Sequence, residues 1–255
     1  MKKIFFAMIL VMIGSFLAPV SQAAEYDWTG PYVGASIGGA FGRSDPHTIV
    51  RSTSRGANYF ITTDFNQIDD AGTARLSPSS FISGGQAGFN YQTRKLVVGL
   101  ETGFENLGLN RANSATQEYL SAPGTTFTLE HSIRADWFCS VRPRVGWAIG
   151  KWLAYGTTGI AISRLKFNEQ FSDTFTPAYE SSSSSKTKIG WIIGAGAEYA
   201  LTTHWTVRTE YLFTNFGHLS NTNSPLVLPA GQGDEFDHSI DMNVHSIHLG
   251  INFRF

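Results

Sequence analysis

The chain has 255 residues, of which 42% are hydrophobic and 13% aromatic, with 26 glycines and one cysteine. Its formal net charge of −1 excludes nucleic-acid binding by bulk electrostatic attraction, and a single cysteine (Cys139) excludes an internal disulfide. Beyond its first residues, no run approaches 18 apolar positions, so we expect no helical membrane span.

The first residues have the order of a secretory signal peptide. Lys2 and Lys3 precede an uncharged run over residues 4–17, and small residues lead to a cleavage site after Ala23. Roughly 14 apolar residues are too few for a comfortable membrane anchor. We therefore expect residues 1–23 to be removed and residues 24–255 to form one domain. Cleavage lowers the 19 Lys and Arg to 17, against 20 Asp and Glu.

The first half of the mature chain predicts three strands, because apolar and polar residues alternate with a period of two. They cover residues 32–41, 80–91 and 95–107, and only a short polar turn separates the second from the third. The polar segments at residues 42–79 and 110–130 are expected to be long loops.

The second half predicts five more strands, at residues 132–149, 152–167, 188–201, 205–213 and 244–255. Pro143 lacks an N–H, so we expect a bulge or other irregularity in the fourth strand. The phase of the fifth strand is open, since either Leu153 and Tyr155 or Trp152 and Ala154 could face outward.

Two further polar stretches are expected to be loops, one holding the serine run 181–185 and one over residues 218–238. Long and short connections therefore alternate. In the last strand Ile247, Leu249, Ile251, Phe253 and Phe255 alternate with polar or small residues. About ten tilted residues cross a bilayer, and a strand can do so only within a closed barrel.

These features predict an all-β protein: an eight-stranded antiparallel up-and-down transmembrane β-barrel with four long extracellular loops and three short periplasmic turns. Aromatic residues gather in two groups, as girdles at both membrane surfaces would. The alternative is a soluble barrel of lipocalin type, which would reverse the inner and outer polarity. The girdles and the terminal strand favour the cell outer membrane.

Four segments resemble one known family: residues 27–34 (DWTGPYVG), 84–91 (GGQAGFNY), 141–147 (VRPRVGW) and Glu210-Tyr211. They are similar to strands of the small outer-membrane surface-antigen barrels of alphaproteobacteria, often labelled outer-membrane immunogenic or porin-family proteins. The resemblance spans the mature chain and implies a barrel related to the membrane domain of outer membrane protein A. It also implies that the terminal strand, with Leu249, Ile251, Phe253 and Phe255, is read by the barrel-assembly machinery.

Charged residues on the inward rows form the candidate site: Glu101, Arg142, Arg144, Glu198, Arg208 and Glu210. Buried unpaired charge is costly, so we expect these residues to pair across the lumen. One interpretation is a structural plug, because the side chains of an eight-stranded barrel just fill it. The other is a gate whose pairs rearrange to pass small ions.

No catalytic residues are predicted. The adjacent pairs His131-Ser132, His238-Ser239 and His245-Ser246 point to opposite faces of their strands, so none forms a nucleophile–base contact by itself. Cys139 is expected on a lipid-facing row as an inert thiol.

The predicted loops supply two weaker candidates for binding. The first loop combines basic and aromatic residues, which would suit haem: Arg43, His47, Arg51, Arg55, Arg75, Tyr59, Phe60 and Phe65. The last is acidic and could bind a divalent cation: Asp234, Glu235, Asp237 and His238. Neither has a diagnostic metal-ligand spacing, and loop charge is usually solvated surface. No cofactor is predicted.

The sequence therefore predicts an outer-membrane surface protein with a structural, envelope-integrity and surface-antigen role. The alternatives are a narrow, low-conductance porin and a loop-based binder of haem. The expected partners are outer-membrane lipid, lipopolysaccharide and the barrel-assembly machinery, with small ions or haem at the loops and no nucleic acid.

Overall fold

The computed structural model describes residues 26–52, 59–73, 76–229 and 231–255. The predicted signal peptide, and Arg55 and Arg75 of the predicted first loop, lie outside these described residues. Within the described ranges, no helix is long and apolar enough to cross a membrane.

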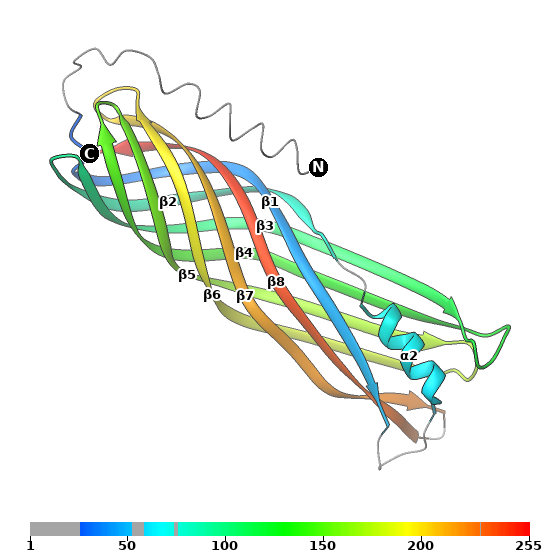
Figure 1. Ribbon diagram of the computed structural model, residues 1–255. Helices are drawn as coiled ribbons and strands as arrows, with labels where there is room; N and C mark the ends of the chain where they lie inside the picture. Colours follow the sequence, from blue (N-terminus) through cyan, green and yellow to red (C-terminus); the bar gives the residue numbers. More distant parts are fainter. Residues whose placement is uncertain (1–25, 53–58, 74–75, 230) are drawn as a thin grey trace.

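The described residues form one antiparallel barrel of eight strands in chain order (Figure 1). The strands are β1 (Gly30–Arg51), β2 (Ser79–Thr93), β3 (Leu96–Glu118), β4 (Thr126–Ile149), β5 (Trp152–Asp173), β6 (Tyr179–Ala200), β7 (Trp205–Leu228) and β8 (Gly231–Arg254). β1 pairs with β8 from Tyr32↔Arg254 to Arg51↔Glu235, which closes the sheet. Closure leaves no strand edge in lipid, where unpaired backbone groups are costly. The predicted fold class is confirmed.

The prediction of four long extracellular loops is wrong for three of them. Three short turns lie at the end that holds the carboxyl terminus, as predicted (Figure 1). At the opposite end only the β1–β2 connection is long, and it carries the helix α2 (Thr62–Ala71). The serine run 181–185 belongs to β6, and residues 218–238 lie almost entirely in the β7–β8 hairpin.

Strand β8 shows why these segments read as loops. One row of side chains faces the lumen along the whole strand: Phe236, His238, Ile240, Met242, Val244, Ser246, His248, Asn252 and Arg254. This row is mostly apolar up to Val244 and polar from Ser246 onward. The outward row changes in the opposite sense, from Asp237, Ser239 and Asp241 to Ile247, Leu249 and Ile251.

The barrel therefore has two parts of inverted polarity. The part near the short turns, which we call the membrane part, has an apolar surface that suits lipid and a polar lumen. The outer part of the barrel has a polar outer surface and an apolar core, as a soluble barrel has. Where the outward row faces water, its side chains are polar. The apolar outward row by which each strand was recognised in the sequence therefore stops, although the strand continues.

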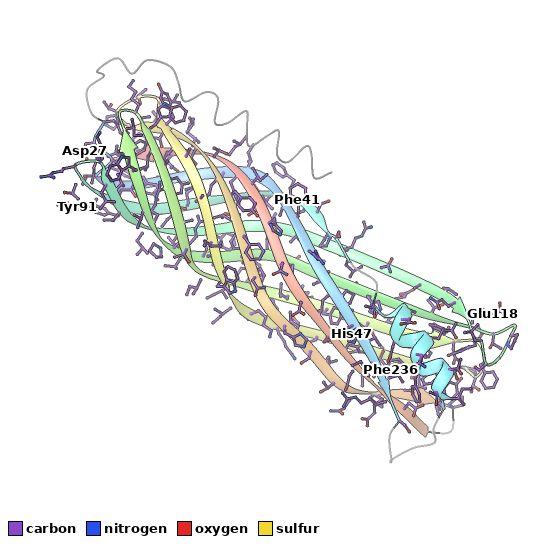
Figure 2. All side chains as sticks on the ribbon, in the orientation of Figure 1. Asp27, Phe41, His47, Tyr91, Glu118 and Phe236 are labelled. Carbon is purple, nitrogen blue, oxygen red and sulfur yellow. The ribbon has the colours of Figure 1, made fainter. Side chains whose placement is uncertain are left out.

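Aromatic side chains mark the limits of the lipid-facing belt. Tyr91, Trp147, Trp205 and Phe255 are exposed near the short turns, and Phe41, Phe104 and Trp191 are exposed part-way along the barrel. Figure 2 shows Tyr91 at the end of the barrel and Phe41 well inside its length. The second band thus lies at the polarity change, and both bands are placed as girdles of a membrane barrel are.

The sheet is incomplete in the outer part at two places. Between β1 and β3, strand β2 reaches outward only as far as Ser79, and α2 fills the space beyond it. Asp69 of α2 accepts from the Val50 N–H (3.0 Å), and the Gln67 side chain donates to Glu118 O (2.6 Å). Between β6 and β7, no paired residues are found from Trp191↔Asn215 to Tyr179↔Val227. There the ammonium groups of Lys186 and Lys188 reach across to carbonyls of β7.

Two details of the strands answer questions that the sequence leaves open. In β5, Leu153 and Tyr155 face the lumen, and Trp152 faces outward. At Pro143 the ladder to β5 is interrupted between Val141↔Ile160 and Arg144↔Thr157 without a change of register. The irregularity is therefore a gap in pairing, and the register shifts of β4 lie elsewhere, between Ala135 and Phe138 on the β5 side.

The inversion of polarity predicts opposite tolerance to charge on one face of β8. Leu249→Arg places a guanidinium in the lipid belt and should lower the free energy of unfolding by about 2–4 kcal/mol. Ser239→Arg lies on the same outward row but outside the lipid belt, beyond the aromatic band that contains Phe41 and Phe104. It should change the free energy of unfolding by less than about 0.5 kcal/mol. Urea unfolding in lipid vesicles measures both, and equal effects would refute the placement of the belt.

Candidate functional site

The lumen of the membrane part holds a compact network of charged side chains. The structure brings together all six residues predicted for it, each no more than 4% exposed: Glu101, Arg142, Arg144, Glu198, Arg208 and Glu210. They come from β3, β4, β6 and β7, whose period of two aims them into the barrel. Three guanidinium groups face three carboxylates, so the network has no formal net charge.

Glu101 is the centre of this network. Its carboxylate accepts from Arg208 Nη1 at 2.6 Å and Arg144 Nη1 at 3.4 Å, and it also contacts Arg142. The Tyr32 hydroxyl donates to it at 2.6 Å. A carboxylate with four donors offsets much of the cost of its own burial and that of its partners.

Glu210 and Glu198 complete the network on either side. Glu210 accepts from Arg142 at 3.2 Å and from Arg208 at 3.3 Å. Glu198 accepts from Arg144 at 3.0 Å and, at its other oxygen, from the Asn252 amide at 2.8 Å. Each arginine is therefore paired with at least one carboxylate, and each carboxylate with at least one arginine.

Tyrosines extend the network, and sequence reasoning missed their role. The guanidinium of Arg144 lies over the Tyr155 ring, 3.8 Å from its centroid, and the Tyr155 hydroxyl donates to Glu210 at 3.1 Å. Tyr32 bonds Glu101 and also Arg144. The available signal was the inward phase of β5, which the sequence left open, so Tyr155 could not be assigned to the lumen.

The lumen is filled on both sides of the charged network. Toward the short turns lies Trp28, fully buried, and Arg254 donates to the carbonyls of Asp27 and Thr29. Toward the outer part lies an apolar core that begins with residues such as Ile82, Leu107 and Leu212. The network is thus enclosed by packed side chains above and below.

A hydrogen-bonded histidine and serine lie between the network and the apolar core. His248 Nε2 is 2.8 Å from Ser246 Oγ, and His248 Nδ1 is 3.6 Å from a carboxylate oxygen of Glu105. This pair is two residues apart, so both side chains share one face, unlike the adjacent His-Ser pairs of the sequence. All three side chains are at most 5% exposed, and packed residues separate them from solvent.

A second buried polar cluster lies in the outer part of the barrel. Glu169 lies between two imidazoles: His131 Nδ1 is 2.8 Å from one oxygen, and His238 Nδ1 contacts the other. Glu180 is 3.6 Å from His238 Nε2 and accepts from the Ser224 hydroxyl at 2.5 Å. Burial lowers the pKa of His131 to about 4 and that of His238 to about 3, and it raises the pKa of Glu180 to about 7.

The predicted acidic loop is part of strand β8, so its residues cannot act together. Asp234 and His238 face the lumen, whereas Glu235 and Asp237 lie on the other face of the strand. Asp237 pairs with Arg51 at 3.0 Å. Across the described ranges, no group of three or more His, Cys, Asp or Glu is arranged to hold a metal ion.

The residues predicted for the first loop are divided between the barrel wall and its outer end. Arg43, His47 and Arg51 lie on β1, and Tyr59, Phe60 and Phe65 lie at the outer end of the barrel. Haem binding by this set stays a prediction.

A closed antiparallel barrel with an apolar belt, two aromatic bands and a charged lumen defines an outer-membrane β-barrel protein. The family described as outer membrane protein beta-barrel domain matches residues 8–255, so the chain belongs to this family. The chain is 30% identical over 251 residues to a 31 kDa outer-membrane immunogenic protein of Brucella melitensis, covering 96% of this chain and 91% of that protein.

Two further relatives agree with this assignment. A 25 kDa outer-membrane immunogenic protein of Brucella ovis is 26% identical, with 80% of this chain and 78% of the relative covered. A 22 kDa outer membrane protein of Rhizobium leguminosarum is 29% identical, with 68% and 66% covered. The chain is therefore a protein of the cell outer membrane.

The geometry at Glu101 predicts a large effect of one neutralising substitution. Glu101→Gln leaves three buried guanidinium groups facing two carboxylates and should lower the free energy of unfolding by about 3–5 kcal/mol. Glu130→Gln, at an exposed position of β4, is the matched control and should change it by less than about 0.5 kcal/mol. Unfolding in lipid vesicles, followed by tryptophan fluorescence, compares the two, and equal stabilities would count against the network.

The buried Glu180 predicts a pH dependence of stability. Its folded pKa of about 7 lies above its value in an unfolded chain, so ionisation costs stability progressively as the pH rises from about 4 to 7, and the full cost is present above about 7. Glu180→Gln cannot ionise, and its stability relative to the wild type should therefore increase by about 2–3 kcal/mol between pH 5 and pH 8. A difference that stays constant with pH would contradict this account.

Proposed function

We propose that this protein is a structural, surface-exposed barrel of the outer membrane whose lumen is closed along its whole length. The observation that carries this proposal is the continuous filling of the lumen. Trp28 and Arg254 occupy the periplasmic end, and the arginine–glutamate network occupies the membrane part. Apolar side chains and the buried cluster around Glu169 occupy the outer part. A wall with an interior of this kind supports an envelope role and offers no route for solutes.

A narrow porin is the alternative that shares these residues. Passage of ions would require the charged network to separate, at the cost of unpaired buried charge. It would also require the apolar core outside the network to open, because that core lies on the same path. The charged network and the apolar core both block the same path, which favours the plugged barrel over the gate.

The surface-antigen role rests on the outer part of the barrel. Strands β3 to β8 extend well beyond the lipid belt, and their polar outer faces would project from the cell surface. Leu120, on the β3–β4 connection, is 74% exposed, and Phe175, on the β5–β6 connection, is 61% exposed. Two relatives carry names that describe them as immunogenic, which supports the same role here.

Planar-bilayer recordings of the refolded mature protein test the closed lumen. We expect no discrete conductance steps from the wild type, and none from Glu210→Gln, because the apolar core still closes the path. In cells, loss of the protein should increase sensitivity to detergent, and the wild-type gene should restore resistance.

The outcome that would contradict the proposal is equally definite. Reproducible unitary steps from the wild type, altered in size by Glu210→Gln but not by the exposed control Glu130→Gln, would establish an ion path through the network. The protein would then be a small porin.

A further inference from the structure

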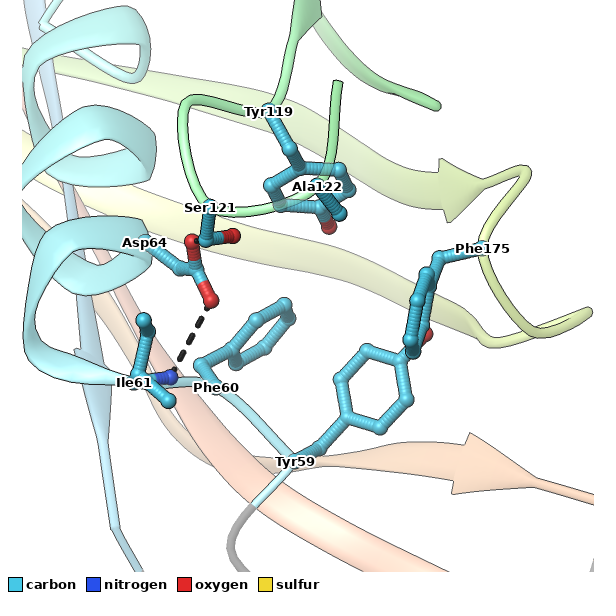
Figure 3. A pocket seen from close by; sticks show the side chains of 8 residues that line it. All are labelled: Tyr59, Phe60, Ile61, Asp64, Tyr119, Ser121, Ala122 and Phe175. Atoms are coloured by element: carbon cyan, nitrogen blue, oxygen red, sulfur yellow. Dashed lines mark hydrogen bonds between the residues drawn. The ribbon is translucent and has the colours of Figure 1, made fainter. Parts of the chain in front are cut away.

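The outer end of the barrel is covered by a cap with a cavity in it. The cap consists of the segment that leads into α2, the β3–β4 connection and the β5–β6 connection. Between them lies a partly open cavity of about 230 Å³, and Figure 3 shows the side chains that line it. Its lining residues are Tyr59, Phe60, Ile61, Asp64, Tyr119, Ser121, Ala122 and Phe175.

Aromatic rings make up half of this lining. Tyr59 and Phe60 lie edge to face at 4.9 Å, and Tyr59 and Phe175 do so at 6.4 Å, so the rings are turned at large angles to one another. Tyr119 adds a ring from the opposite side of the cavity (Figure 3). Rings at differing angles around one space present both edges and negatively polarised faces to an occupant.

Hydrogen bonds to one carboxylate hold the two tyrosines. The hydroxyls of Tyr59 and Tyr119 donate to Asp173 Oδ2, at 2.7 Å and 3.1 Å. Burial and the Asp173 acceptor raise the pKa of Tyr59 to about 12, and burial likewise raises the pKa of Tyr119. Both phenols therefore stay neutral at physiological pH, and their positions are set before any ligand arrives.

One carboxylate, that of Asp64, lines the cavity, and the carboxylates of Asp173 and Asp234 lie behind its aromatic wall, to which they are hydrogen-bonded. Asp64, which is buried, accepts from Ser121 Oγ at 2.5 Å and from the Ile61 N–H at 3.1 Å. Asp234 accepts from the backbone N–H groups of Tyr59 and Phe60. Among the residues that the structure describes, neither of these nor Asp173 forms an ion pair, and one oxygen each of Asp173 and Asp234 is buried without a hydrogen-bond partner.

We propose that this cavity binds a small organic cation with a methylated ammonium group. Ring faces attract such a cation, and the carboxylates of Asp64, Asp173 and Asp234 add a negative potential in a partly desolvated space. The cavity of about 230 Å³ has room for a molecule as small as choline. A metal ion would need more oxygen ligands than the ring-lined wall offers, and an anion would be repelled.

Two sources can supply this chemistry, a free cation such as choline and the head group of a choline lipid. Both present the same trimethylammonium group, but the lipid head group adds a phosphate, which the three carboxylates disfavour. We therefore expect free choline to bind more tightly than glycerophosphocholine. The reverse order would assign the site to the lipid head group.

Calorimetric titration of the mature protein, refolded in octyl glucoside at low ionic strength, tests the proposal. The probes are choline, glycerophosphocholine and the uncharged carbon isostere of choline, 3,3-dimethyl-1-butanol. Choline should bind the wild type at least about tenfold more tightly than the isostere. Asp64→Asn keeps the shape of the side chain but removes its charge, so the affinity for choline should fall at least about tenfold, while affinity for the isostere is unchanged.

Three more variants separate binding from folding. Asp70→Asn removes an exposed carboxylate from the same helix and should leave choline binding unchanged. Tyr119→Leu removes a ring face and should weaken choline binding, whereas Tyr119→Phe keeps the ring and should retain most of it. Failure of the wild type to bind either ammonium probe, equal affinity for choline and its isostere, or full binding by Asp64→Asn would overturn the proposal.

Discussion

The backbone hydrogen bonding of a closed barrel is the constraint on which the rest of this structure depends. Because β1 and β8 pair over nearly their whole length, every strand has a fixed inner and outer face from one end to the other. A slip of one residue would exchange the two faces. The change from lipid to water along the barrel therefore cannot be met by turning a strand. It is met by exchanging the polarity of both rows at once, as β8 does between Val244 and Ile247.

This inversion explains what could be predicted from the sequence and what could not. In the lipid belt the outward row is apolar, and each strand was recognised there, because Leu249 and Ile251 alternate with polar residues. Beyond the belt the outward row faces water, and β6 reads as a run of serines although it is a strand. The inward row still alternates: Leu107 and Leu109 continue the row of Glu101 and Glu105. This inward apolar row could have revealed the outer part of the strand. It was missed because apolar residues move from the outward row to the inward row at that point.

The candidate site was predictable to the same degree. Charged residues on β3, β4, β6 and β7 can be assigned to the lumen from sequence, because placing their charges in lipid would be costly. Their tyrosine partners are harder to assign: Tyr155 could equally belong to an aromatic girdle, because the phase of β5 was left open. The cap was not predictable at all as a site. Tyr59 and Asp64 come from the β1–β2 connection, Tyr119 from the β3–β4 connection and Asp173 from the end of β5, and only the closed barrel brings them together.

The two parts of the barrel divide the physical tasks between them. In the membrane part every lumen charge needs a partner, so a change of one residue disturbs several others, and the interior is constrained. In the outer part the sheet is interrupted at two places, and side chains of α2, Lys186 and Lys188 replace backbone pairing there. Such bridges need water beside them, because lipid would leave the remaining backbone groups unsatisfied. Irregular structure is therefore confined to the region outside the membrane. The cap, with its buried carboxylates, can exist only there, on a wall that the lipid-embedded part keeps rigid.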